Sequence, residues 1–230
     1  MSKSCPLYGV AISQDCVECD TKDCRTMNKK KYKEICIGID QSYKNCGISV
    51  SADGRLLKVS HVDLNIYDTN SLKRFVLKEK LKPIIVKMLD KADKVICVIE
   101  RIRLQSRGFV NINYIKSIGA LNALIVDICS KYDVQVYSVD TRCWKSQVVG
   151  TSKPQVNSYG VPTEKWPTVH WVNKQGFKNS ILRKVKGRKK KGTFIGANDI
   201  RYQFDNDAAD SAAISMFWFV GDRDKLKEEH

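Results

Sequence analysis

The sequence predicts an α/β fold in which helices flank a mixed five-stranded sheet. Two uncharged apolar runs, residues 35–39 and 95–99, have the length and composition of strands that are buried on both faces. Residues 71–92 and 112–129 instead carry apolar side chains at helical spacing. Strands that alternate with helices in this way favour parallel pairing of the two buried strands.

The remaining elements follow in chain order. Residues 48–50 and 56–66 predict two antiparallel strands, because turn residues precede each of them. Pro83 predicts either a kink or a new helix start within residues 71–92. Residues 134–139 predict a fifth strand, and Asp140 is interpreted as the N-cap of a short helix that reaches Trp144. A final helix is expected from Asp207 to Phe219.

Four carboxylates are placed to meet at one edge of this sheet. Asp40 and Glu100 directly follow the two buried strands, whose carboxyl ends form the edge where open α/β sheets bind ligands. Asp207 and Asp210 share one face of the final helix. Four such groups cannot all stay ionised without cations between them, and oxygen ligands suit Mg²⁺ or Mn²⁺. The pattern predicts a metal-dependent phosphoryl-transfer site.

Each acid also has a simpler explanation. Asp40 can begin a turn, Glu100 can pair with the arginines that follow it, and Asp207 and Asp210 can favour a helix N-terminus through its dipole. The metal site is favoured by the order of all four acids and by the elements that carry them.

Composition sets the broader expectations. A chain of 230 residues suits one α/β domain with an appendage. With 40 Lys and Arg against 25 Asp and Glu, the net charge of +15 predicts a polyanionic partner, most simply nucleic acid. A merely soluble basic protein is the alternative. We expect no membrane span and no signal peptide, and therefore a cytoplasmic protein with reduced thiols. Association with a nucleoid or with a viral replication compartment is left open.

Residues 1–33 form a distinct N-terminal arm in this interpretation, with a basic linker at 29–33. Four thiolates could hold one structural Zn²⁺, although their spacing is not that of a standard zinc ribbon. An arm with incidental cysteines is the alternative. The four candidate ligands are Cys5, Cys16, Cys19 and Cys24. The main domain is expected at 34–222, with insertions at about 151–163 and 181–203.

Two basic segments are candidates for phosphate binding. Arg101, Arg103 and Arg107 follow Glu100, and they either face a bound strand or balance local acids. A run before the final helix is either solvated or a phosphate-binding arm, through which affinity would fall steeply with salt. Its basic residues are Arg183, Lys184, Lys186, Arg188, Lys189, Lys190 and Lys191.

The order of elements resembles the ribonuclease H-like superfamily, and the motifs resemble RuvC-type Holliday-junction resolvases. Ile-Gly-Ile at 37–39 before Asp40, with Gly47 following, is similar to the first motif of the family, and Ile-Glu at 99–100 is similar to the second. Residues 141–150 resemble the Arg-x-x-Lys-x-x-Val-Val-Gly segment. Asp-Ala-Ala-Asp at 207–210 is similar to the last motif.

The resemblance implies that Asp40, Glu100, Asp207 and Asp210 hold two catalytic Mg²⁺ ions, with Mn²⁺ as a substitute. Lys145 would lie beside the scissile phosphate. A second active-site lysine is also implied, and the candidates are Lys165 and Lys153. The family has an aromatic wedge where Arg103 stands here, and Phe109 is the candidate replacement.

The implied activity is resolution of four-way DNA junctions, in recombination and repair, by paired phosphodiester hydrolysis in a homodimer. The apolar helix at 112–129 is the candidate dimer interface, and a core helix would explain its stripe equally well. A nuclease for forks or flaps is one alternative function. A non-catalytic branched-DNA-binding protein is another, but such a protein would be expected to have lost at least one of the four carboxylates.

The zinc hypothesis has a direct test. If the four N-terminal thiolates form a structural site, freshly purified reduced protein should contain one zinc per chain, and replacing Cys16 and Cys19 by Ser should remove that zinc. Elemental analysis measures both. Wild-type protein without stoichiometric zinc would leave the cysteines incidental.

Overall fold

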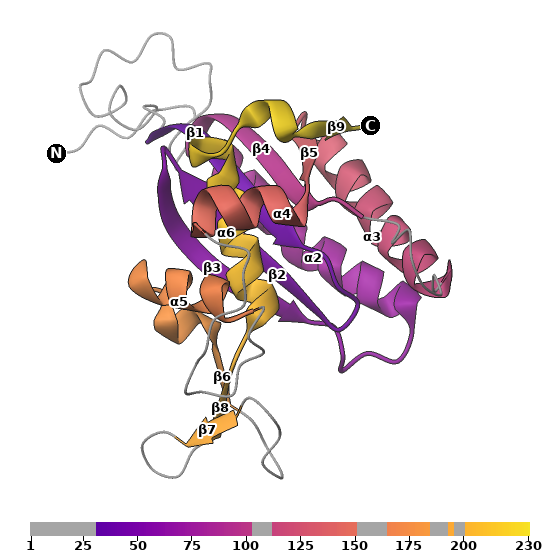
Figure 1. The fold of residues 1–230 in the computed structure, drawn as a ribbon. Helices are drawn as coiled ribbons and strands as arrows, with labels where there is room; N and C mark the ends of the chain where they lie inside the picture. Colours follow the sequence, from indigo (N-terminus) through magenta and orange to yellow (C-terminus); the bar gives the residue numbers. More distant parts are fainter. Residues whose placement is uncertain (1–30, 103–111, 151–164, 185–192, 196–200) are drawn as a thin grey trace, which may run out of the picture.

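A computed structural model describes residues 31–102, 112–150, 165–184, 193–195 and 201–230, and it contains the predicted mixed sheet (Figure 1). The sheet has six strands rather than five, in the order β3-β2-β1-β4-β5-β9. The additional strand, β9, lies beyond residue 222 and pairs antiparallel with β5. The strands are β1 (Tyr32–Asp40), β2 (Asn45–Ala52), β3 (Arg55–Asp63), β4 (Ala92–Glu100), β5 (Gln135–Val139) and β9 (Lys227–Glu229).

Helices cover both faces of this sheet. Figure 1 shows α6 across one face, with α4 and α5 beside it, while α2 and α3 lie against the other. None of the helices in the described part of the chain combines the length and apolar composition that crossing a bilayer requires. The helices are α2 (Asn70–Leu89), α3 (Ile112–Ser130), α4 (Thr141–Trp144), α5 (Trp166–Lys174) and α6 (Asn206–Val220), with a π-helical turn η1 (Lys145–Val149) and short 3₁₀ turns η2 (Lys178–Ile181) and η4 (Arg223–Lys225).

The two predicted buried strands lie side by side and parallel. In β1, Ile35 and Ile39 pack into the core beneath α2 and α3, while Cys36 packs toward α6 on the opposite face. This alternation explains why the run is apolar at every position. Pairing of Ile39 with Ile99 places the ends of β1 and β4 at the same edge, as the sequence predicted.

Helix α6 lies unusually close to β1 and β2 because two glycines face it. A Cβ atom on Gly38 would come within 2.4 Å of the Ser211 carbonyl oxygen, and one on Gly47 within 2.0 Å of the Asp207 carbonyl oxygen. The Ser49 hydroxyl donates to the same Ser211 oxygen at 2.6 Å. The contacting face of α6 carries only small side chains, at Ala208, Ser211, Ala212 and Ser215.

A second, three-stranded sheet precedes α6, and the sequence analysis did not predict it. Its strands are β6 (Leu182–Lys184), β7 (Thr193–Ile195) and β8 (Arg201–Phe204), in the order β6-β8-β7. Figure 1 shows it projecting from the body of the molecule beyond the start of α6. Arg183 and Lys184 belong to β6, while residues 185–192 of the basic run lie outside the described residues.

The structure narrows the alternatives that the sequence left open for two helices. Helix α2 continues through Pro83, so no new helix starts there. In α3, the apolar stripe is buried inside the subunit, where Ile118, Leu121 and Ile125 pack into the core. The stripe is therefore explained by packing within one chain, and it no longer indicates a dimer interface.

The glycine contacts predict a large effect of one methyl group. Gly47→Ala should lower the free energy of unfolding by about 2 kcal/mol or more, because the added carbon overlaps the backbone of α6. Urea unfolding measures this change. Gly119→Ala in α3 is the matched control, since its added carbon meets no described atom within 4 Å beyond its chain neighbours and its own helix backbone, and Ala favours helices by about 1 kcal/mol over Gly. Equal effects of the two substitutions would contradict the close packing of α6.

Candidate active site

The ends of β1 and β4 are tied together at the carboxyl edge of the sheet. Asp40 ends β1 and Glu100 ends β4. The buried Gln41 side chain donates to the backbone oxygen of Glu100 and accepts from the backbone nitrogen of Glu100 at 3.2 Å. The backbone N–H and C=O groups of Glu100 are thus both hydrogen-bonded to the side-chain amide of Gln41. The clamp fixes the spacing of the two strand ends.

Helix α6 brings two more carboxylates to this edge. Asp205 caps the helix by accepting from the Ala208 nitrogen at 3.0 Å. Asp207 then lies in the first turn and Asp210 one turn later, on the side that faces β1 and β2. Asp210 is only 1% exposed, and its Oδ1 atom has no hydrogen-bond partner among the described residues. A buried carboxylate oxygen in this condition favours a cation nearby.

Lys165 supplies the positive charge that the structure places among these acids. Its Nζ lies 2.6 Å from Asp210 Oδ2. Burial alone would lower the pKa of Lys165, but Asp210 and Asp40 outweigh burial and raise its pKa above the ordinary lysine value. The ammonium group therefore stays charged at neutral pH. Between the two lysines that the sequence analysis left open, the structure places Lys165 at the acids, while Lys153 lies outside the described residues.

The carboxylates repel one another. Burial, followed by the charges of Asp210, Glu100 and Asp207, raises the pKa of Asp40 well above its usual range. The pKa of Glu100 is also raised, mainly by burial, against the lowering effect of a hydrogen bond from the Thr141 hydroxyl. Burial and the neighbouring Asp205 raise the pKa of Asp207. Mutual repulsion of this kind is typical of functional sites.

A hydrogen-bond network that the sequence analysis missed orients Asp207 from strands β2 and β3. The Asn45 side-chain nitrogen donates to Asp205 Oδ1 at 2.8 Å and to Asp207 Oδ2 at 3.2 Å. His61 Nδ1 lies 2.8 Å from Asp205 Oδ2. Strands β2 and β3 thereby orient the start of α6. Asp205 had a local sequence signal, because Asp is a common N-cap residue. The contacts of Asn45 and His61 had none, because they join residues far apart in the chain.

Lys145 lies on the Glu100 side of the site. Asp140 caps α4 as predicted, since its side chain accepts from the Arg142 nitrogen at 2.9 Å. The chain then continues into the π-helical turn that begins with Lys145. The Lys145 ammonium lies 5.1 Å from the centre of the Trp144 ring, and its charge lowers the pKa of Glu100.

The donor set fits a hard divalent cation in chemistry. The available side-chain atoms at the edge are carboxylate oxygens, which Mg²⁺ and Mn²⁺ prefer. In the described ranges, no three His, Cys, Asp or Glu side chains lie close enough together to hold a metal ion. The carboxylates would therefore have to move closer together to bind one. The unpaired Asp210 Oδ1 and the raised pKa of Asp40 nevertheless indicate a site that gains stability from added positive charge.

Other predicted site residues lie elsewhere or outside the description. The Arg101 guanidinium donates to the Ser138 hydroxyl at 3.3 Å and to the Lys225 carbonyl oxygen at 3.3 Å, so we do not include it among the phosphate ligands. The remaining predicted residues outside the described ranges are Cys5, Cys16, Cys19, Cys24, Arg103, Arg107, Phe109, Lys153, Lys186, Arg188, Lys189, Lys190 and Lys191.

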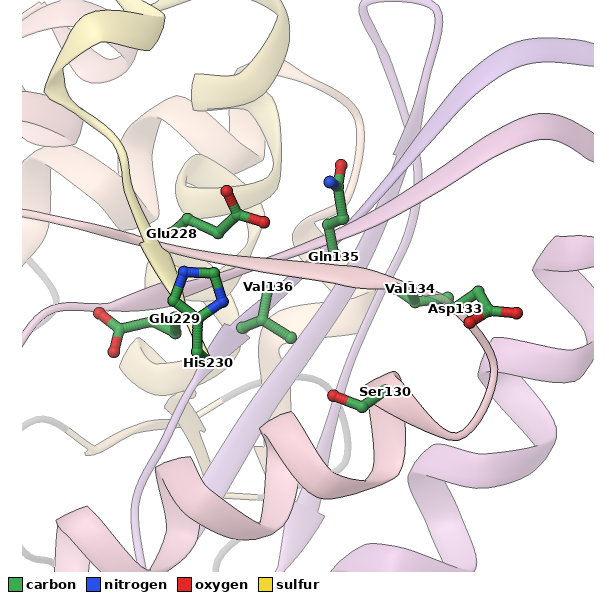
Figure 2. Close-up of a pocket in the computed structure, with 8 residues that line it drawn as sticks. All are labelled: Ser130, Asp133, Val134, Gln135, Val136, Glu228, Glu229 and His230. Carbon is green, nitrogen blue, oxygen red and sulfur yellow. The ribbon is translucent and has the colours of Figure 1, made fainter.

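A separate acidic pocket near the end of the chain does not belong to this site. Asp133, Glu228, Glu229 and His230 line it together with the start of β5. Figure 2 shows that the carboxylates of Glu228 and Glu229 point in different directions instead of converging. The pocket lies at the opposite end of β5 from Val139, the residue that pairs with Glu100.

Comparison with solved structures identifies the fold as that of RuvC. The Thermus thermophilus RuvC structure is similar over 85% of this chain and 99% of that chain, with a TM-score of 0.51 and 13% identity. T. thermophilus RuvC in complex with a Holliday junction substrate gives a TM-score of 0.52 at 12% identity, with the same coverage. The yeast mitochondrial Holliday junction resolvase Ydc2 gives 0.47 at 14% identity, over 85% of this chain and 82% of that one. No family model and no curated protein matches the sequence.

The repulsion at the site predicts a stability effect. Asp40→Asn should raise the free energy of unfolding of the metal-free protein at pH 7 by about 1–2 kcal/mol, because it removes one of several like charges. A raised pKa in the folded state means that wild-type stability falls as pH rises from the ordinary aspartate range through the folded value. The gain should therefore shrink at acidic pH.

Urea unfolding in EDTA at neutral and acidic pH measures this difference. Asp93→Asn is the matched control, since Asp93 is exposed at the start of β4 and away from the acids. If Asp40→Asn destabilised the protein at pH 7, or if its effect did not depend on pH, the electrostatic description of the site would be wrong.

Proposed function

We propose that this protein is a metal-dependent endonuclease that resolves four-way DNA junctions. The observation that carries the proposal is the convergence of Asp40, Glu100, Asp207 and Asp210 on one sheet edge, with Lys165 against them. Three different elements deliver these carboxylates, and all are buried or half-buried. If these carboxylates served only in structural ion pairs, each would be expected to have a basic partner, and four of them would not gather at one sheet edge.

The four carboxylates are the proposed ligands of two Mg²⁺ ions. Ions bound there would supply charge neutralisation for an in-line displacement at phosphorus and would lower the pKa of a bound water. Asn45, Gln41 and Thr141 keep the ligands in place: Asn45 orients Asp207, Gln41 holds the backbone of Glu100, and Thr141 donates to the Glu100 carboxylate. These contacts orient the Asp207 and Glu100 carboxylates in the absence of a ligand.

The two lysines have separate proposed roles. Lys165 balances the charge of Asp210 in the absence of substrate, and its flexible side chain can turn from Asp210 to a non-bridging phosphate oxygen when cations occupy the acids. Lys145 stands at the Glu100 side, where its ammonium adds positive charge near the transition state. Both lysines therefore bind the phosphate that is cleaved.

DNA as the substrate is supported by charge and by fold. A net charge of +15 surrounds an acidic centre, which suits a polyanion that contacts both protein cations and bound metal ions. The likeness to RuvC, including a complex with a Holliday junction substrate, supports a four-way junction over other nucleic acids. A junction needs two matched incisions, so we propose that two copies act as a symmetric dimer.

The basic segment before α6 is the proposed source of general affinity for DNA. Strand β8 leads directly into the capping Asp205, so the small sheet is attached next to the first turn of α6, which carries Asp207. Arg183 and Lys184 belong to its strand β6. Closely spaced cations can bind phosphates of any sequence, whereas two active sites at a fixed separation select the geometry of the junction.

A cleavage assay tests the proposed function. With Mg²⁺, the purified protein should cut a four-way junction by paired incisions and cut linear duplex at least about a hundredfold more slowly. Asp207→Asn and Asp210→Asn should abolish cleavage and leave junction binding intact or tighter, because loss of negative charge favours DNA. Asp127→Asn, a change on the exposed side of α3, is the matched control and should cut normally.

The panel of substrates also separates the alternatives. Forks or flaps cut faster than the junction would replace the resolvase by another branched-DNA nuclease. Selective junction binding without cleavage, in Mg²⁺ and in Mn²⁺, would indicate a non-catalytic binding protein. Full cleavage by Asp207→Asn, with metal contamination controlled, would falsify the assignment of the site.

A further inference from the structure

A groove lies between the second half of α2 and the edge strand β3, and none of the four carboxylates lines it. Its volume is about 450 Å³, and Tyr32 of β1, Leu57 of β3 and Pro83 of α2 are among the residues that line it. Tyr32 begins the nine-residue strand that Asp40 ends. At roughly 3.3 Å per residue, Tyr32 in the groove lining lies about 26 Å along β1 from Asp40.

The inner wall of the groove is apolar, and a β-bulge adds to it. Val50 is buried at its base, and Ile84 and Met88 of α2 are half-buried beside it. In the pairing of β2 with β3, Val50 lies opposite Lys58, but the next residue, Ser51, lies opposite Leu56. Leu57 is therefore left without a partner in β2. The bulge leaves Leu57 38% exposed at the groove. An exposed leucine beside buried apolar residues is suited to cover another apolar side chain.

The rim of the groove is positively charged. Lys58, Lys87 and Lys91 line it, and all three are exposed. None of them forms an ion pair with a carboxylate in the described part of the chain. Asp90 is adjacent in sequence but does not line the groove. Three ammonium groups with no ion-pair partner among the described residues surround an apolar floor, and such a surface favours an acidic ligand with apolar side chains.

We propose that this groove binds an acidic peptide segment of a partner protein, with a leucine or phenylalanine inserted beside Leu57 and Met88 and carboxylates at the lysine rim. Charge complementarity selects this occupant. Duplex DNA would match the lysines but would offer a phosphate backbone to the apolar floor, where its charge would lose hydration. A second copy of this chain is disfavoured at this groove, because a symmetric interface here would bring the two lysine rims together.

The test uses the full-length protein and a fluorescein-labelled peptide in which a Leu-Phe-Leu centre is flanked by Asp and Glu. Fluorescence anisotropy should show saturable binding. The combined substitutions Lys58→Glu, Lys87→Glu and Lys91→Glu should weaken affinity about tenfold or more. Lys78→Glu, Lys80→Glu and Lys82→Glu make the same change of charge on exposed positions of α2 outside the groove, and they should weaken it by less than about threefold.

The apolar contribution is tested separately. Leu57→Ser should weaken peptide binding severalfold, and a peptide with Ser in place of the Leu-Phe-Leu centre should bind wild-type protein equally weakly. Because Leu57 is partly exposed, this substitution leaves the core in place, and thermal unfolding checks that it does. DNA cleavage should be unchanged in Leu57→Ser and should be the same in the groove triple as in the control triple, which separates a failure of this proposal from a failure of the proposed nuclease activity.

Several results would overturn the proposal. Absence of saturable binding would do so, as would equal losses from the two lysine triples, which would mean attraction by overall charge alone. A groove triple that loses linear duplex while it keeps the peptide would identify a nucleic-acid surface. A change of oligomeric state in sedimentation, caused by Leu57→Ser, would identify an interface between copies of this chain.

Discussion

The close approach of α6 to the sheet is the constraint on which the site depends. Side chains normally separate a helix from the strands beneath it, but Gly38 and Gly47 have none, so the backbone of α6 lies directly on β1 and β2. The carbonyl group of Asp207 contacts Gly47, which itself pairs with Asp40. Two backbone contacts thus place the carboxylates of the last helix at the end of the first strand.

This arrangement gathers charges that repel one another, and the surrounding contacts offset the repulsion. Lys165 neutralises part of the charge of Asp210, while Asn45 and Thr141 donate to Asp207 and Glu100. Burial still raises the pKa of Asp40, so the balance is incomplete in the protein alone. A site that is less stable than its scaffold is common where ligands must bind, because the bound cation supplies the missing interaction.

Local chemistry decided which features the sequence could reveal. The doubly buried strands and the cap at Asp140 follow from patterns within a few residues, and the structure contains them. The edge strand β9 has the charged sequence Lys-Glu-Glu and no alternation, so backbone pairing with β5 alone defines it. Helix α5 had a usable signal in Pro167, at its first turn, that the sequence analysis did not use. The pairing of Asn45 and His61 with Asp205 arises only from the fold.

The central claim is that the four carboxylates form one divalent-metal site, and Mn²⁺ binding followed by electron paramagnetic resonance tests it most directly. The account predicts two Mn²⁺ ions per chain with the magnetic coupling of closely spaced ions, and loss of that coupling in Asp210→Asn, because the buried charge of Asp210 acts on Asp40. Uncoupled Mn²⁺, or coupling that survives in Asp210→Asn, would contradict it.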